Sequence, residues 1–341
     1  MRTPLEMDFN PRKRRLCFLA VVLLAYTVFS TDRLRCEVPN VIDQQQTAQQ
    51  LQSHLTMLTR TIGERSVSAP ENLDKTATYI QSFYNSIGIP VQFEPYNYRS
   101  LTVNNVVAEL KITPTPAVHF LLGAHYDSVS GTVGADDNAS AVAVQLETAR
   151  ELVSLADRDA LNIAVTFVSF ALEEPPVYGT RYMGSRVYAA KARREKIKID
   201  GMICLEMVGY TCHTPGCQHY PFPLMFFDYP KQGDFIGIVG NSGSRSFARR
   251  LKRSFLQNPD LPVVSLTVPF NGRILPAVRL SDHASFWDKG YPAVMVTDSA
   301  FFRNPHYHTR SDTMETLDVD FMAQLVKSLV DFFGSHRRRQ E

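Results

Sequence analysis

Four acidic and imidazole side chains lie close together in the segment HFLLGAHYDSVSGTVGADDNASAVAV, residues 119–144. His125 and Asp127 follow a run of apolar residues that is typical of a buried strand, and Asp136 and Asp137 come shortly afterwards. Burying such groups is costly unless something pairs with them. The segment is therefore either a solvated loop or part of a metal site.

Side chains that can bind metal recur at the ends of other apolar segments. Glu173 and Glu174 follow NIAVTFVSFAL, Glu206 lies at the end of GMICL, and His306 and His308 follow AVMVTD. Ligands of open α/β sheets bind beyond the carboxyl ends of the strands. The sequence therefore predicts that these side chains converge on one site.

The residue types at this predicted site suit two zinc ions. Zinc binds histidine nitrogen and carboxylate oxygen, and a catalytic site leaves a position for water. Two ions can share a bridging carboxylate, and a further carboxylate that is free of metal can act as general base. The pair Glu173 and Glu174 can supply one group of each kind, because neighbours in an extended segment point in different directions.

The elements around these residues predict an α/β fold. Apolar strand-like segments alternate with amphipathic helix-like segments, which favours a three-layer α/β/α sandwich with a mostly parallel mixed sheet. Helices are expected at residues 43–60, 70–86, 140–155, 183–196, 246–256 and 318–333. The sequence has no internal repeat and no interdomain linker, so residues 36–336 are predicted to form a single catalytic domain.

Residues 1–35 are predicted to direct the chain out of the cytoplasm. The basic segment PRKRR, residues 11–15, precedes an apolar run at residues 16–30. This order is typical of a secretory signal, and the run is short for a membrane helix, which needs about 20 residues. A cleaved signal peptide and a single N-terminal membrane anchor both stay open. Either one places the catalytic domain outside the cytoplasm, in the periplasm or the extracellular space.

The charge distribution argues against a nucleic-acid partner. The net charge is only +2, and without the basic runs at residues 11–15 and in the tail at residues 337–341 the rest of the chain would be mildly acidic. No basic stripe is interleaved with aromatic residues, as nucleic-acid binding would require. The tail is expected to be solvated.

Two of the five cysteines, Cys212 and Cys217, enclose the turn-like segment HTPG. A local disulfide between them is expected in an exported protein. The alternative, a zinc knuckle, needs two further thiols, and Cys36 and Cys204 are poorly placed to supply them.

Taken in order, these motifs resemble the co-catalytic zinc aminopeptidase family, which includes bacterial leucyl aminopeptidases, glutamate carboxypeptidase and glutaminyl cyclase. The matched segments are GAHYDSV, GADDNASA, ALEEPP, MGSR, SDHASFW and HYHTRSDT. The resemblance begins near TIGERSVSAP and covers most of the chain. It implies the fold of the zinc-dependent exopeptidases and the hydrolysis of peptides that have a free N-terminus.

The resemblance also implies roles for individual residues. His125 is expected to bind one ion, with Asp127 orienting its ring. Asp136 is expected to bridge the two ions, and its peptide bond to Asp137 is expected to be cis. His308 is expected to bind the second ion, with support from Ser281.

Three glutamates complete the implied site. Glu173 is expected to be the general base that acts on a metal-bound water, and Glu174 is expected to be a ligand. Glu206 stands where the family usually has Asp. Because Glu is one methylene longer, the sequence leaves open whether the site holds two zinc ions or one.

Two other functions stay open beside the aminopeptidase. One is the cyclisation of N-terminal glutamine by a glutaminyl cyclase-like site with one zinc ion. The other is a binding protein that has kept the fold without catalysis, although the retained base and ligands argue against it. Substrate selection is expected to depend on the insertion after Glu174 and on the loops at residues 209–227 and 268–280.

Overall fold

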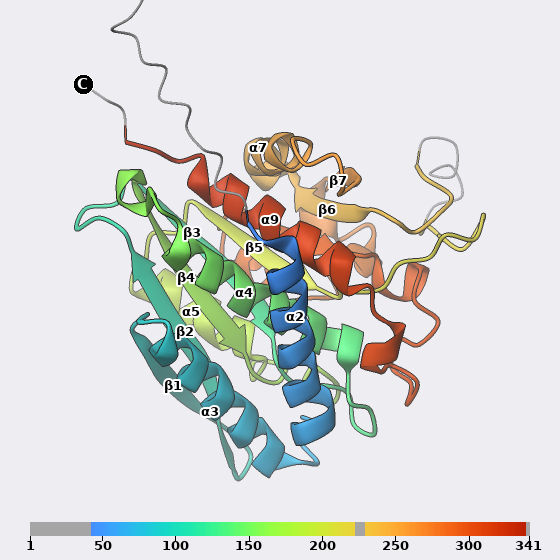
Figure 1. Cartoon of the computed structure of the whole chain (residues 1–341). Helices are drawn as coiled ribbons and strands as arrows, with labels where there is room; N and C mark the ends of the chain where they lie inside the picture. The colour runs from blue at the N-terminus through green and yellow to red at the C-terminus, as the bar shows by residue number, and fades with distance from the viewer. Residues whose placement is uncertain (1–41, 222–228, 339–341) are drawn as a thin grey trace, which may run out of the picture. The chain divides into compact units, whose positions relative to one another are not determined.

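Figure 1 shows the computed structural model of the chain, which describes residues 42–221 and 229–338. The predicted signal or anchor segment, residues 1–35, lies outside these residues. So do the end of the basic tail and residues 222–228 of one expected selection loop. Within the described ranges, no helix is both long enough and apolar enough to cross a membrane.

In the described part of the chain, eight strands form one mixed sheet in the order β1-β2-β4-β3-β5-β8-β6-β7. The strands are β1 (Val91–Tyr98), β2 (Leu101–Lys111), β3 (Val118–His125), β4 (Ile163–Phe170), β5 (Gly201–Glu206), β6 (Ile236–Asn241), β7 (Val263–Val268) and β8 (Ala293–Thr297). The pairs β4–β3, β3–β5, β5–β8 and β6–β7 are parallel, whereas β1–β2, β2–β4 and β6–β8 are antiparallel. The predicted mixed sheet is confirmed.

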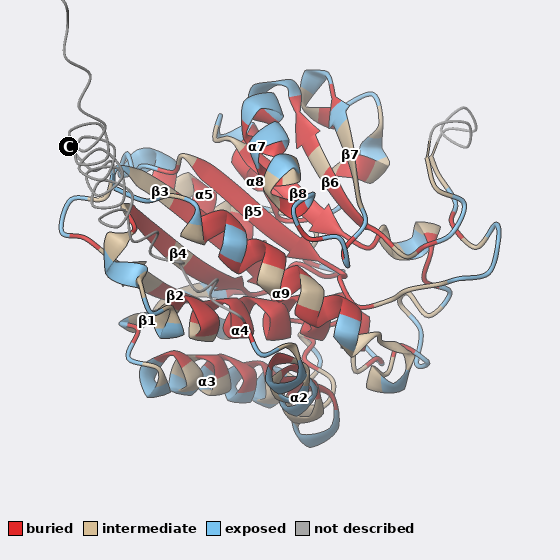
Figure 2. Ribbon diagram, turned by 45° about the horizontal axis from the view of Figure 1, so that its top comes forward, coloured by how far each residue is buried: buried red, intermediate tan, exposed pale blue. Residues whose placement is uncertain are grey.

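Helices cover both faces of this sheet. They are α2 (Gln44–Leu55), α3 (Pro70–Ser86), α4 (Ala141–Ser154), α5 (Gly184–Arg194), α7 (Arg245–Phe255), α8 (His283–Asp288) and α9 (Val319–Gly334). The helices α2, α3, α4, α7 and α9 share one side and the larger core, and α5 and α8 pack together on the other. Figure 2 shows α4 almost wholly buried beneath its neighbours. The predicted three-layer sandwich is therefore confirmed.

The expected helix boundaries hold closely, with one difference at the first helix. The chain does not stay α-helical to residue 60, because π-helical turns replace the α-helix over Thr56–Ile62 and end at Gly63, whose φ is 87°. The N-terminus of α2 is capped by Asp43, whose carboxylate accepts a bond of 3.0 Å from the backbone N–H of Gln46.

The parallel strands bring the predicted metal-binding residues to one edge of the sheet. His125 at the end of β3 is paired with Phe170 at the end of β4, three residues before Glu173. Glu206 at the end of β5 is paired with Thr297 at the end of β8. The candidate site therefore lies at the carboxyl edge of the central strands.

The predicted disulfide between Cys212 and Cys217 is present, with an S–S distance of 2.07 Å. It closes a small loop in the connection that follows β5. Cys204 is a buried free thiol. The zinc-knuckle alternative is thereby excluded.

Candidate metal centre

Asp137 lies between the two histidines of the candidate site. Its Oδ1 is 3.4 Å from Nε2 of His125, and its Oδ2 is 3.2 Å from Nε2 of His308. One carboxylate therefore faces both rings, each through a different oxygen. This is the placement that a bridging ligand of two ions needs.

Each histidine also has a glutamate of its own. Oε2 of Glu206 is 3.4 Å from Nε2 of His125, and Oε2 of Glu174 is 3.3 Å from Nε2 of His308. The ligand atoms of His125, Asp137 and Glu206 lie within 4.8 Å of one another, and so do those of Asp137, Glu174 and His308. The ligand atoms of His125, Glu173 and Glu174 form a third such group, so the side chains make three overlapping groups, and Asp137 belongs to the two that contain Glu206 and His308.

Unpartnered polar atoms within the cluster fit a bound cation. Nε2 of His125, Oδ1 of Asp137 and Oε1 of Glu174 are buried and have no hydrogen-bond partner among the described residues. Leaving such atoms unsatisfied costs roughly 1–3 kcal/mol each, and more for charged groups. Histidine nitrogen and carboxylate oxygen are zinc ligands, so the residues present suit the metal that the sequence predicts.

The pKa values of the clustered side chains also indicate an excess of buried negative charge that a cation would balance. Burial would lower the pKa of His308, but Asp137 and Glu174 outweigh it and raise this pKa to about 10. Burial likewise opposes a charge on His125, yet Glu206, Asp127 and Asp137 raise its pKa well above the usual range. Burial, together with Asp137, raises the pKa of Glu174 to about 8. In the metal-free protein these shifts favour the protonated forms of both histidines and of Glu174.

Zinc binding is therefore expected to release protons near neutral pH. Both histidines have raised pKa values, so they are protonated without metal and must lose protons to become ligands. Calorimetric zinc titrations at pH 7.5 in buffers of different ionisation enthalpy measure this release, and we expect at least about one proton per protein. Binding without proton release would contradict these shifts.

The same shift gives a pH dependence to the stability of the metal-free fold. Protonated His308 adds to the free energy of unfolding, and this stabilisation is fully present below the pKa of histidine in the unfolded chain, about 6.5. The stabilisation is lost as the pH rises through about 10, the pKa of His308 in the folded protein.

Asp127 fixes the segment that carries the two glutamates. Its Oδ1 and Oδ2 accept bonds of 3.0 Å from the backbone N–H groups of Glu173 and Glu174. Its Oδ1 also lies 3.4 Å from Nδ1 of His125, as expected for a residue that orients the ring. One carboxylate therefore aligns the ring and the proposed base together.

Asp137, and not Asp136 as expected, is the aspartate that faces both histidines in the structure. Oδ1 of Asp136 accepts a bond of 2.9 Å from the N–H of Gly209, and Oδ2 accepts one of 2.6 Å from Asn304. These bonds use the Asp136 carboxylate to hold neighbouring loops. The cis peptide bond is likewise one residue later than expected, between Asp137 and Asn138.

Ser281 was expected to support His308, but in the structure it supports Glu206. Its hydroxyl donates a bond of 2.5 Å to Oε2 of Glu206. This bond holds the longer glutamate side chain in the position where it meets His125. His306 turns away from the cluster, and its Nδ1 lies 2.8 Å from Oγ of Ser311.

Tyr307 belongs to the site but was missed in the sequence. Its ring stacks on the ring of His308, with centroids 3.7 Å apart and an interplanar angle of 19°. Burial, and then the carboxylates of Asp137 and Glu174, raise the pKa of its phenol. Its position between two histidines in HYH was the available signal.

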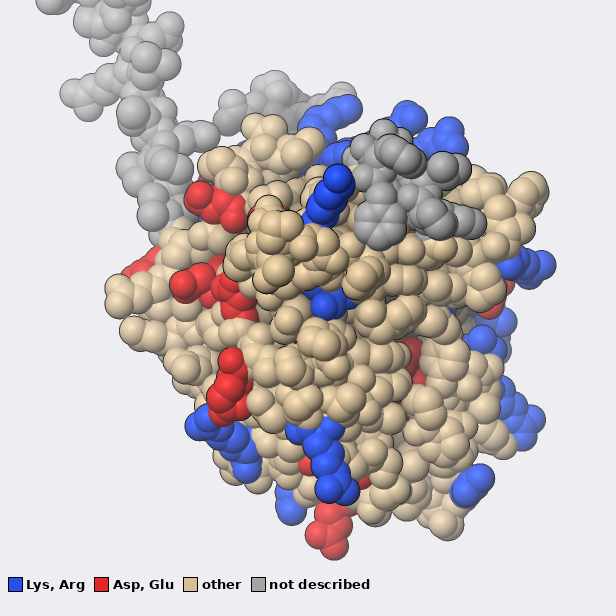
Figure 3. Space-filling model, turned by 90° about the vertical axis from the view of Figure 1, so that its right-hand side faces the viewer, with Lys and Arg blue, Asp and Glu red and all other residues tan. Residues whose placement is uncertain are grey.

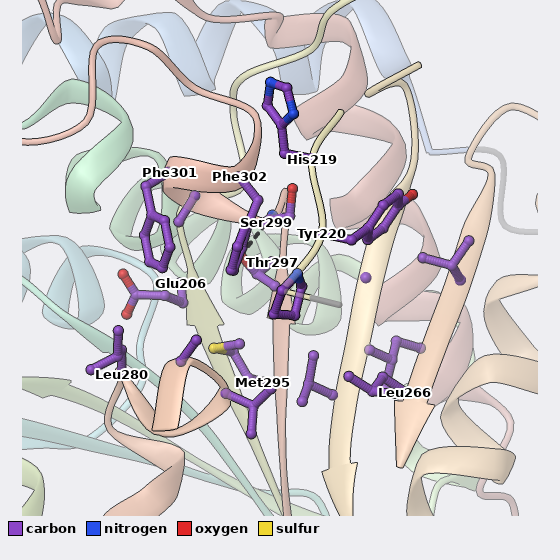
Figure 4. A pocket seen from close by; sticks show the side chains of 18 of the residues that line it. Glu206, His219, Tyr220, Leu266, Leu280, Met295, Thr297, Ser299, Phe301 and Phe302 are labelled. Atoms are coloured by element: carbon purple, nitrogen blue, oxygen red, sulfur yellow. Dashed lines mark hydrogen bonds between the residues drawn. The ribbon is translucent and has the colours of Figure 1, made fainter. Parts of the chain in front are cut away.

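An apolar pocket adjoins the cluster at Glu206 and has a volume of about 830 Å³, including its open mouth. Figure 4 shows Glu206 between Leu280 and Phe301 at one end, with Leu266 toward the other. The lining residues come from β6, β7, β8 and the loops beside them, and include Ile238, Val264, Leu266, Met295, Phe302 and Tyr220. The pocket thus leads from the cluster into apolar surroundings.

Uncharged side chains cover most of the face shown in Figure 3, with a few lysine, arginine and acidic side chains among them. Phe301 and Leu280 are 40% and 41% exposed at the pocket mouth. The approach to the cluster therefore suits an apolar group.

A set of histidines and carboxylates, buried except for the half-buried His308, at this edge of an α/β/α sandwich defines a candidate metal-dependent enzyme. The family model described as "Peptidase family M28" matches residues 105–332, which is more than half of the chain. The chain belongs to this family. The resemblance found in the sequence is thereby confirmed, and so is the predicted class at the level of a peptidase family.

Curated relatives agree with this assignment. The chain is 38% identical over 290 residues to an Escherichia coli protein called "Uncharacterized protein YfbL". The aligned region covers 83% of this chain and 86% of that protein. The chain is also 25% identical over 276 residues to a "Probable zinc metalloprotease" of Pyrenophora teres, across 73% of this chain. The chain spans about half the length of this fungal relative, 53%.

Solved structures share the fold. BSAP, "a zinc aminopeptidase from Bacillus subtilis", has a TM-score of 0.65 at 15% identity over 86% of this chain and 95% of that one. The Porphyromonas gingivalis glutaminyl cyclase has a TM-score of 0.60 at 18% identity over 86% and 98%. Because hydrolase and cyclase share this fold, the fold alone does not separate the two reactions.

Proposed function

We propose that the protein uses two zinc ions to remove the N-terminal residue from peptides that have a free N-terminus. The observation that carries the proposal is the position of Asp137 between His125 and His308, with unpartnered buried ligand atoms on both sides. A carboxylate that presents one oxygen to each of two histidines is placed to serve two ions.

In the proposed arrangement, one ion is held by His125, Asp137 and Glu206, and the other by His308, Asp137 and Glu174. Bound zinc polarises the carbonyl of the scissile bond and makes a water molecule easier to deprotonate. Ser281 and Asp127 keep the ligands in place through their contacts with Glu206, His125 and Glu174.

Glu173 is the proposed general base. It is buried beside the ligands, and its backbone N–H is fixed by Asp127. Burial raises its pKa well above the usual range, and His125 partly offsets this effect. A carboxylate of raised pKa can take a proton from the attacking water and pass it to the departing nitrogen.

The apolar pocket beyond Glu206 is the proposed site for the side chain of the N-terminal residue. Its lining of aliphatic and aromatic residues favours large apolar side chains. We therefore propose peptides with Leu, Met or Phe at the N-terminus as preferred substrates.

Filling this pocket is expected to change side-chain preference. Leu266→Trp places a larger ring in the lining shown in Figure 4. We expect kcat/KM for leucyl peptides to fall by about 10- to 200-fold, the range for a mismatch in an apolar pocket, with a smaller change for alanyl peptides. Leu256→Trp, at a position that is 57% exposed, is the control. Equal losses for both peptides would place the side chain elsewhere.

The catalytic domain is proposed to act outside the cytoplasm. The basic and apolar segments at residues 11–30 support this location. The Cys212–Cys217 disulfide adds to it, since disulfides persist in oxidising compartments. A cleaved signal and a membrane tether are both compatible with these features.

The proposed reaction is tested with three matched peptides and the zinc-loaded protein, with the products identified by mass. One peptide has a free N-terminal leucine, the second is its N-acetylated form, and the third begins with glutamine. We expect loss of leucine from the first peptide only. Cleavage of the acetylated peptide would exclude an aminopeptidase, and loss of ammonia from the third alone would identify a cyclase.

A further inference from the structure

The loop over residues 126–134 separates two proposed ligands along the chain. It begins directly after His125 and ends shortly before Asp137, and Nε2 of His125 lies 3.4 Å from Oδ1 of Asp137. Its shape is closely constrained at Gly134, where φ is 51° and a Cβ would lie 2.1 Å from the carbonyl oxygen of Asp137. The conformation of this loop therefore decides whether the two ligands meet.

Arg65 holds both ends of this loop by their carbonyl groups. Its side chain is fully buried. Nε donates to the carbonyl of Tyr126 at 2.8 Å, Nη1 to Val133 at 2.7 Å, and Nη2 to Gly134 at 2.9 Å. Nη1 also donates to the carbonyls of Leu58 and Gly63, at 3.1 and 3.0 Å. One guanidinium thus ties the loop to the turns that precede α3.

The groups that accept hydrogen bonds from Arg65 are all uncharged, so they do not neutralise its positive charge. All five are main-chain carbonyls, and no ion pair joins the guanidinium to a carboxylate within the described residues. Its charge acts instead on nearby carboxylates, among them Asp127, Asp137 and Glu174. Burial lowers its pKa to about 10, which leaves it charged at neutral pH.

Asp312 holds the segment after the loop by its amide groups. Its Oδ1 accepts a bond of 2.8 Å from the N–H of Asp136, and its Oδ2 accepts one of 3.1 Å from the N–H of Asp137. Its main-chain carbonyl accepts from the N–H of Ala135 at 3.4 Å. Two residues that are distant in sequence thus hold neighbouring parts of the chain. Arg65 donates hydrogen bonds to backbone carbonyls of the loop, and Asp312 accepts hydrogen bonds from the backbone N–H groups that follow it.

We propose that Arg65 and Asp312 form a clamp that sets the separation of His125 and Asp137 and so allows the metal pair to form. Both are positioning residues, since they act through the backbone of the loop and touch neither substrate nor metal. The inference rests on the proposed metal site.

The test compares Arg65→Lys and Asp312→Asn with the wild-type chain, measuring zinc affinity against a competing chelator. Lysine keeps the charge but replaces the planar fork of donors with one ammonium, and asparagine keeps the shape of Asp312 but loses its charge. Arg303→Lys is the matched control, because Arg303 is also buried and none of its hydrogen bonds, to Gln218, Tyr210 and Phe235, reaches this loop or the segment that Asp312 holds.

We expect both clamp variants to bind zinc about 10- to 100-fold more weakly, the loss typical of residues that support metal ligands. We also expect them to show altered visible absorption bands when loaded with Co²⁺. Arg303→Lys should keep both the affinity and the bands. Melting temperatures of the metal-free proteins separate this effect from general destabilisation, and Asp312→Asn carries the test if Arg65→Lys fails to fold.

Three results would count against the clamp or its basis. Wild-type affinity and wild-type Co²⁺ bands in a folded clamp variant would overturn the clamp alone. Equal loss of affinity in Arg303→Lys would also overturn it. Failure of the wild-type chain itself to bind zinc would overturn both the clamp and the proposed function.

Discussion

Replacing Glu173 with glutamine is expected to lower kcat by about 100- to 10,000-fold, the range for loss of a general acid–base group. Glutamine keeps the size of the side chain but cannot take a proton from water. Because Glu173 is not among the proposed ligands, zinc content should stay at the wild-type value. Steady-state kinetics with a leucyl peptide and metal analysis of the same sample measure both quantities.

The neighbouring residue provides the matched control for this prediction. Glu174 shares the segment and the support of Asp127, but its carboxylate faces His308. Glu174→Gln should therefore weaken zinc binding, and added zinc should restore part of its activity. Full turnover in a folded, zinc-loaded Glu173→Gln variant would contradict the assignment of the base.

Replacing Asp137 with alanine is expected to have the largest effect on the metal site. Among the described residues, this change removes the carboxylate that lies within 3.4 Å of Nε2 of both histidines. Mutation of residues that only support metal ligands already lowers metal affinity by about 10- to 100-fold. Loss of a shared ligand should therefore lower zinc affinity by more than about 100-fold. Zinc stoichiometry by mass spectrometry under native conditions, together with activity, measures the outcome.

Asp136→Asn is the control for Asp137→Ala. The carboxylate of Asp136 holds Gly209 and Asn304, so its change should lower the melting temperature while zinc stoichiometry stays at the wild-type value. The opposite pattern, with metal lost in Asp136→Asn and kept in Asp137→Ala, would return the bridging position to Asp136.

Much of this site was predictable because the alternation of strands and helices fixes where strands end. His125 and Glu206 lie at the last positions of β3 and β5, and Glu174 follows β4 closely. Adjacent parallel strands place their carboxyl ends at the same edge of the sheet, independently of the conformation of the connecting loops. The convergence of these residues and the layered fold therefore followed from apolar patterning alone.

The choice between Asp136 and Asp137 was not predictable in this way. The two aspartates are adjacent and chemically identical, and the backbone conformation of the loop decides which carboxylate faces the histidines. That conformation depends on Arg65 and Asp312, which come from distant parts of the chain. Local patterning carries no information on such contacts, and the same holds for the bond from Ser281 to Glu206.

The pocket was foreseen only in part. The loops over residues 209–227 and 268–280 were expected to shape substrate selection, and both line the pocket, the first with His219, Tyr220 and Pro221 and the second with Ala277, Val278 and Leu280. A further part of the lining, however, comes from β6, β7 and β8, which the sequence indicated only as core. Side chains at the edge of a sheet line a pocket only when no helix covers them, which depends on tertiary packing.

The central claim is that two zinc ions share Asp137, and anomalous diffraction from zinc-loaded crystals tests it most directly. The account predicts two anomalous peaks about 3.5–4 Å apart. One should lie beside His125 and Glu206, and the other beside His308 and Glu174, with Asp137 between them. A single peak, or two peaks that do not flank Asp137, would contradict it.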